Sequence, residues 1–176
     1  MGTQIKNGIV EDLVIGPKQD YVSAPLEWDV INQLTADVTT TGQTLTDVVT
    51  AAGVGMFSAI LAGGIYEIEA VLQVVASADT NGMEVGINCT QTPVSVQAVV
   101  TGNTATTTGA VVGIVANATA TAAFNTSSAG VGLILIKGIV VGHATVAGNL
   151  SVQFLKVTSG TATVKKGSLF KLRRLV

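Results

Sequence analysis

The stretch IYEIEAVLQVVA, residues 65–76, has the clearest periodic pattern in the chain and decides the fold. Side chains along a β-strand point alternately to the two faces of a sheet. Even-numbered positions from 66 to 74 carry only Tyr, Ile, Ala, Leu and Val, whereas Glu67, Glu69 and Gln73 lie at odd-numbered positions. The pattern predicts a β-strand with one face in a core and the other at least partly wet.

Turn residues follow this strand and recur along the chain. Residues 79–82 end in Asn-Gly and suit a tight hairpin, so residues 83–89 are expected to pair with residues 65–76. Further strand-length runs occupy residues 45–49, 56–61, 94–100, 110–118, 133–141, 149–157 and 168–175. No helical period persists for three turns. The sequence therefore predicts an all-β fold, an antiparallel jelly-roll sandwich of about 8–10 short strands with an extended N-terminal arm.

Three parts of this pattern differ from a regular meander. Residues 110–118 and 133–141 are apolar without clean alternation, as expected for strands that are covered on both faces. Between them, TATAAFNTSSAG at residues 119–130 is low in complexity and is expected to be a loop.

The composition is hydrophobic yet poor in charge. Of the 176 residues, 48% are hydrophobic, 11% charged and 4% aromatic, whereas an ordinary soluble domain has about 25% charged residues. Interspersed surface charge normally keeps chains apart in solution. We therefore expect other subunits to cover much of the surface. The alternative is a monomer whose exterior consists of Thr, Ser, Asn and Gly.

The charges separate along the chain. Residues 1–88 hold eleven acids and two lysines, a net charge of −9, and the rest holds seven bases and no acid. Such asymmetry can mark a nucleic-acid-binding arm. Here the bases lie within strand patterns, so we expect no nucleic acid as a partner and instead a basic closing strand that meets acids of the same or a neighbouring subunit. The expected charged groups are Glu67, Glu69, Arg173 and Arg174.

Residues 1–36 differ from the rest and predict an arm, which leaves residues 37–176 as the head domain. Pro17 and Pro25 each favour extended geometry at the preceding residue and argue against one continuous helix. One interpretation is an arm that docks on a larger body through the apolar anchors Tyr21, Leu26, Trp28 and Ile31. The other is a terminus that only partly packs on its own domain.

Groups that carry chemistry are sparse. His143 is the only histidine, so one chain can build neither a Ser-His-Asp triad nor a multi-histidine zinc site. A metal or anion held by three copies of His143 on a three-fold axis is a minor alternative. Cys89 is the only cysteine and is expected to be a small buried thiol. Residues 48–66 are uncharged, but four glycines interrupt them, so no membrane span is expected. We expect no enzyme, no metal and no cofactor.

Two segments resemble a known group of proteins. AGGIYEIEA at residues 62–70 resembles a strand of small bacteriophage virion proteins whose jelly-roll head is similar to the tumour-necrosis-factor and complement C1q fold. KGIVV at 137–141, NLSVQF at 149–154 and TVKKGSLFKLRRL at 163–175 resemble the closing strands of those proteins. The resemblance covers roughly residues 44–75 and 130–176. The pair at 155–156, Leu-Lys, departs from it, since the family has a small residue followed by Gln or Asn there.

The resemblance implies a function and a set of partners. It implies a homotrimeric, non-enzymatic structural protein at the virion surface, a capsid decoration or head-fibre protein whose arm attaches to the major capsid or tail protein. The alternative is the receptor-binding or glycan-binding head of a tail fibre or short spike, with a host surface glycan as the ligand. Glycan sites usually present an aromatic platform, and outside the arm the chain has only Tyr66 and four Phe.

Overall fold

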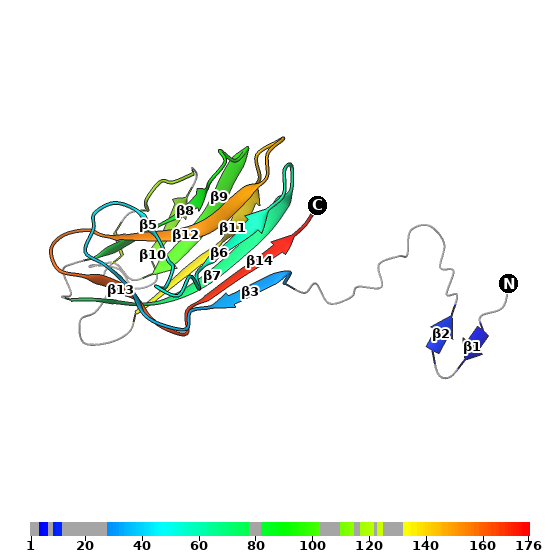
Figure 1. Cartoon of the computed structure of the whole chain (residues 1–176), viewed down its shortest axis with the longest axis horizontal. Helices are drawn as coiled ribbons and strands as arrows, with labels where there is room; N and C mark the ends of the chain where they lie inside the picture. The colour runs from blue at the N-terminus through cyan, green and yellow to red at the C-terminus, as the bar shows by residue number, and fades with distance from the viewer. Residues whose placement is uncertain are drawn as a thin grey trace.

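The fold is an antiparallel β-sandwich, as the sequence predicts (Figure 1). The computed structural model describes residues 4–6, 9–11, 28–77, 82–102, 110–114, 117–121, 123–124 and 132–176. Within these ranges the chain forms fourteen strands and no helix, more strands than expected. The first two strands, β1 (Gln4–Lys6) and β2 (Ile9–Glu11), pair with each other. The predicted anchors Tyr21 and Leu26 lie outside the described residues.

The larger sheet is built around β7 (Ile65–Ala76), the strand whose alternation decides the fold. The other members are β3 (Val30–Gln33), β4 (Val38–Thr40), β9 (Ser95–Gly102), β10 (Ala110–Ile114), β11 (Gly132–Val141), β13 (Ala162–Val164) and β14 (Leu169–Arg174). On one side of β7 lies β11, followed by β9 and β10. On the other side, β14 pairs with residues 66–71 of β7 and β13 pairs with residues 74–76. In turn, β14 pairs with β3 and β13 pairs with β4.

The smaller sheet is built around β12 (Gly148–Lys156). One edge of β12 pairs with β8 (Met83–Cys89), and the other pairs with β5 (Thr46–Asp47) and β6 (Phe57–Ile60). The expected hairpin between residues 65–76 and 83–89 is therefore wrong, because β8 belongs to the opposite sheet. The physical reason is that β11, β14 and β13 already occupy both edges of β7.

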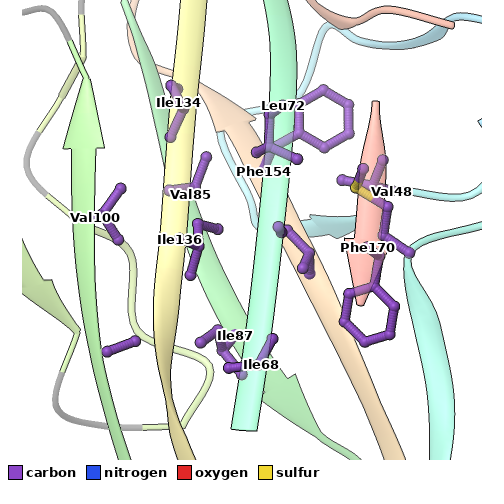
Figure 2. Close-up of a cluster of buried hydrophobic side chains, with 14 of the residues drawn as sticks. Val48, Ile68, Leu72, Val85, Ile87, Val100, Ile134, Ile136, Phe154 and Phe170 are labelled. Atoms are coloured by element: carbon purple, nitrogen blue, oxygen red, sulfur yellow. The ribbon is translucent and has the colours of Figure 1, made fainter. Parts of the chain in front are cut away.

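The core lies between the two sheets (Figure 2). In β7 the expected alternation is confirmed, since Ile68, Ala70 and Leu72 are fully buried. Figure 2 shows Ile68 and Leu72 of β7 on the same side as Ile134 and Ile136 of β11, with Phe154 of the smaller sheet packed near them. Burial of one such large apolar side chain contributes about 1.5–3 kcal/mol. The odd-numbered side chains of β7 point to the opposite face of the larger sheet, away from this core.

The limit between arm and head differs from the prediction. Residues 30–34, which the sequence assigns to the arm, belong to the head: β3 pairs with β14, and Leu34 is buried with 1% exposure. The predicted anchor Ile31 lies on β3 with 60% exposure. Because β14 needs a partner for its second edge, the head includes the chain from Trp28 onward.

Local structure explains why two glycines and a tyrosine occur together in the segment AGGIYEIEA, residues 62–70. The backbone N–H of Leu61 donates a hydrogen bond of 2.7 Å to the Tyr66 hydroxyl. A Cβ at Gly64 would lie 2.6 Å from the Tyr66 ring, so only glycine leaves room for the ring. Gly63 has a φ of 67°, in the left-handed region that glycine tolerates best. The glycine pair and the tyrosine therefore form one unit that shapes the turn into β7.

Candidate interaction surface

The face of the larger sheet that points away from the core is the candidate functional surface, and we call it the outer face. Its side chains come from odd-numbered positions of β7, β9, β11, β14 and β3. The register places one row of them straight across the sheet, in the order Ile31, Lys171, Glu69, Lys137 and Val99. The row begins on edge strand β3 and ends on β9, with β7 in the middle.

Ion pairs cross the centre of the outer face. Lys171 Nζ lies 2.7 Å from Glu69 Oε1, and the Arg173 guanidinium contacts Glu67 Oε2. Lys137 Nζ lies 3.9 Å from the other oxygen of Glu67, but the Lys137 side chain remains 67% exposed. The structure thus brings Glu67, Glu69 and Arg173 together, and the pairs form within one chain.

The sequence identified part of this charge cluster and missed part. Arg174 does not join the cluster, because its Nε donates to the carbonyl of Val176 at 2.7 Å. Lys171 and Lys137 take the places beside Glu69 and Glu67. The sequence could have indicated Lys171, since Lys171 and Arg173 are two residues apart, as Glu67 and Glu69 are. Nothing in the sequence indicated Lys137, because its register against β7 is set only by the fold.

Trp28 lies against the basic side chains of β14. Its ring centroid is 5.5 Å from Lys171 Nζ and 5.4 Å from Arg173 Cζ, within the range of cation–π attraction. Asp29 accepts a hydrogen bond from the backbone N–H of Arg174. Of the two interpretations of the N-terminal segment, residues 28 and 29 fit packing on the chain's own domain.

Large apolar side chains are exposed on both sides of the ion pairs. They are Ile31 (60%), Leu133 (56%), Val99 (50%), Leu135 (44%) and Ile139 (37%). A hollow of about 400 Å³ opens on the β9 side, lined by Glu69, Val99, Thr101, Leu135, Ile136 and Lys137. The apolar, non-alternating run at residues 133–141 was expected to be covered on both faces. Within one chain only its inner face is covered, where Ile134, Ile136 and Val140 are buried.

The smaller sheet presents a different outer surface. The odd-numbered positions of β12 carry Asn149, Ser151 and Gln153, and Asp47 of β5 accepts hydrogen bonds from the Ser151 hydroxyl at 2.7 Å and the Gln153 amide at 2.8 Å. Leu155, where the sequence departs from the family pattern, is 9% exposed. Ser151 and Gln153 of this surface have their hydrogen bonds within the chain, whereas contiguous exposed apolar surface marks an interaction site.

The two candidate reactive side chains have structural surroundings. His143 Nδ1 accepts hydrogen bonds from the backbone N–H groups of Thr145 at 3.2 Å and Val146 at 3.1 Å. Cys89 is 3% exposed, and burial raises the pKa of its thiol to about 11. The thiolate, the reactive form of cysteine, is therefore scarce at neutral pH. Among the residues that the structure describes, no three His, Cys, Asp or Glu side chains gather as a metal site would require.

Neither comparison of the sequence with known proteins identifies a relative of this chain. The described part of the chain contains no helix long and apolar enough to cross a membrane. A scan against protein-family models finds none that matches the chain, and a search among curated proteins finds no match.

Proposed function

We propose that the chain is a non-enzymatic structural protein of a bacteriophage virion, a capsid decoration or head-fibre protein that trimerises through the outer face. The observation that carries the assembly is the exposed apolar surface of β11 and β9, above all Leu133, Leu135 and Val99. The phage role is supported by the sequence resemblance at residues 62–70 and 163–175.

The energetics favour apolar contact over charge as the source of assembly. Full burial of a Val, Leu or Ile side chain contributes about 1.5–3 kcal/mol, so each half-exposed side chain of the outer face contributes about 1 kcal/mol when a neighbour covers it. Solvent-exposed ion pairs contribute about 0–1 kcal/mol. The pairs at Glu67 and Glu69 are already made within the chain. They orient the contact, and the apolar side chains supply its free energy.

The arm gives the trimer its attachment. Three arms held on one trimer bind neighbouring sites with a much higher effective concentration than three separate chains. We place the end of the arm before Trp28, because the head begins there. The partner of the arm is the major capsid protein or a tail protein, and the protein resides at the virion surface.

The first prediction concerns the oligomeric state. Light scattering coupled to size-exclusion chromatography should give about three times the chain mass of 17.8 kDa at micromolar concentration. Leu135→Asp places a charge in the hollow and should shift the protein to monomers. The matched control is Val94→Asp, because Val94 is 65% exposed but precedes β9 and does not line the hollow. A monomeric native chain, or equal effects of both variants, would contradict the proposal.

The second prediction concerns attachment. Deletion of residues 1–27 should abolish co-sedimentation of the protein with virions that lack it, while the trimer mass is retained less the deleted residues. The deletion stops before Trp28, so the contacts of Trp28 and Asp29 with β14 stay intact. Full co-sedimentation of the deletion variant would show that the head itself carries the attachment site.

A receptor-binding or glycan-binding head is the second candidate. The observation in its favour is Phe57, which is 38% exposed and pairs with Ser151 on the polar surface of the smaller sheet. An exposed aromatic ring beside hydrogen-bonding side chains suits a sugar. The other three Phe side chains are fully buried, so this surface offers a single ring among the described residues.

A further inference from the structure

The outer face has an exposed apolar side chain on its β3 edge and a hollow on its β9 side. Ile31 is the most exposed large apolar side chain of the face, and it lies on β3, which among the described residues pairs only with β14. The hollow lies on the other side of the face, over β7, β11 and β9, beside Val99 and Leu135. Within one chain the projection and the hollow cannot meet, because β14 and β7 lie between β3 and β11.

We infer that in the trimer, whose ring symmetry requires a head-to-tail contact, Ile31 of one subunit packs into the hollow beside Leu135 and Val99 of the next. This inference rests on the trimer proposed above and adds which surfaces meet. A head-to-tail contact of this kind forms a closed ring when its rotation closes. In a ring of three, each subunit offers one Ile31 edge and one hollow, and no hollow is left without an occupant.

Charge at the centre of the face argues against a two-fold contact. In an isologous contact, residues near the symmetry axis face their own copies. The middle strand of the outer face is β7, so a two-fold axis there would set Glu69 against Glu69 and Lys171 against Lys137 of the other copy. Like charges brought together at an interface cost several kcal/mol. A contact between opposite ends of the face avoids both clashes.

Charge at the two ends favours the heterologous contact. Asp29 lies two residues before Ile31 and is exposed. Lys137 borders the hollow, is 67% exposed, and lies 3.9 Å from Glu67. When Ile31 enters the hollow of the next subunit, Asp29 comes near that subunit's Lys137, so opposite charges meet at the rim of the apolar contact. Rim charges of this kind steer association and fix register.

Disulfide trapping tests this contact. We would prepare the double variant Ile31→Cys with Leu135→Cys and oxidise it with oxidised glutathione. Within one subunit the two positions lie three strand spacings apart across the sheet and two residues apart in register, a separation of about 16 Å. A disulfide requires Cα atoms within about 7 Å. Only a contact between subunits can join them. The expected result is a covalent trimer as the main band on a non-reducing gel, reverting to monomer on reduction.

The controls separate the possible outcomes. The pair Ile31→Cys with Val94→Cys should stay monomeric on the gel, because Val94 does not line the hollow. Each single variant should give no trimer, which also shows that buried Cys89 does not take part. Covalent dimers as the end product would indicate an isologous contact and overturn the inference. A trimer by light scattering without crosslinks would also overturn it and leave the proposed trimer intact, whereas a monomer by light scattering would overturn both.

Discussion

Gly138→Ala should lower the free energy of unfolding by about 3 kcal/mol, the upper part of the range for overpacked cores. A Cβ at Gly138 would lie 2.4 Å from the carbonyl oxygen of Gln97 and 2.5 Å from both Cα and Cβ of Ala98. These atoms belong to β9, which is fixed against β11 over seven residue pairs. The backbone cannot move away at one position without disturbing the register on either side. The added methyl group therefore strains two strands.

Gly132→Ala in the same strand is the matched control. A Cβ at Gly132 would lie 3.5 Å from the nearest atom, a methyl carbon of Val74, which is an ordinary contact. We expect a change within about 0.5 kcal/mol. Urea unfolding of both variants at one fixed protein concentration gives the comparison, since an oligomer's stability depends on concentration. Equal destabilisation by the two substitutions would mean that the close approach at Gly138 is relaxed in solution.

Phe124→Ala should cost about 3–5 kcal/mol, as for other fully buried aromatic side chains. Phe124 is 0% exposed, and its backbone exchanges hydrogen bonds of 2.7 and 2.8 Å with Met83 of β8. Its ring lies against Gly102 at the end of β9, where a Cβ would come within 2.7 Å of the ring. Phe124 thus packs between a strand of each sheet. Removal of the Phe124 ring leaves a cavity between β8 and β9, both of which Phe124 contacts.

Two further variants, Phe57→Ala and Phe124→Leu, serve as comparisons for the loss of stability in Phe124→Ala. Phe57 is 38% exposed, so its replacement should cost much less than that of Phe124. Leucine keeps much of the apolar volume at position 124, and we expect an intermediate loss. Thermal unfolding suits this series, because 1 kcal/mol shifts the midpoint by about 2–4 °C in a domain of 150–250 residues. A Phe124→Ala midpoint equal to that of Phe57→Ala would show that residue 124 does not anchor its segment.

Phe124 also shows where sequence reasoning is incomplete. Residues 119–130 were expected to form a loop because they are low in complexity. Within the described residues of that segment, Thr121 and Phe124 donate backbone hydrogen bonds to β8 at 2.9 and 2.8 Å. A single buried ring among Thr, Ala and Ser gives no periodic signal. Its burial depends on Gly102, which is distant in sequence and leaves the space for it.

Of the residues on the candidate surface, only the charged ones were predictable from the sequence. Glu67 and Glu69 could be placed on one face from the period of β7, and Arg173 could be placed on a closing strand. Their pairing follows from the antiparallel register of β14 against β7, in which residue 173 meets residue 67 and residue 171 meets residue 69. The exposure of Leu133 and Leu135 was not predictable, because an apolar run gives the same pattern whether a sheet or another subunit covers it.

The sequence by itself determined that the chain forms strands and which residues of β7 face the core. The reason is that side-chain alternation is a local property of an extended backbone. The tertiary structure decided which strands pair, placing β8 beside β12 and Lys171 beside Glu69. Those choices involve partners far apart in the chain, and the entropy of closing a loop changes so slowly with its length that sequence distance does not select among them. The strand pairing is instead set by which strands occupy the two edges of β7, namely β11 on one edge and β14 and β13 on the other.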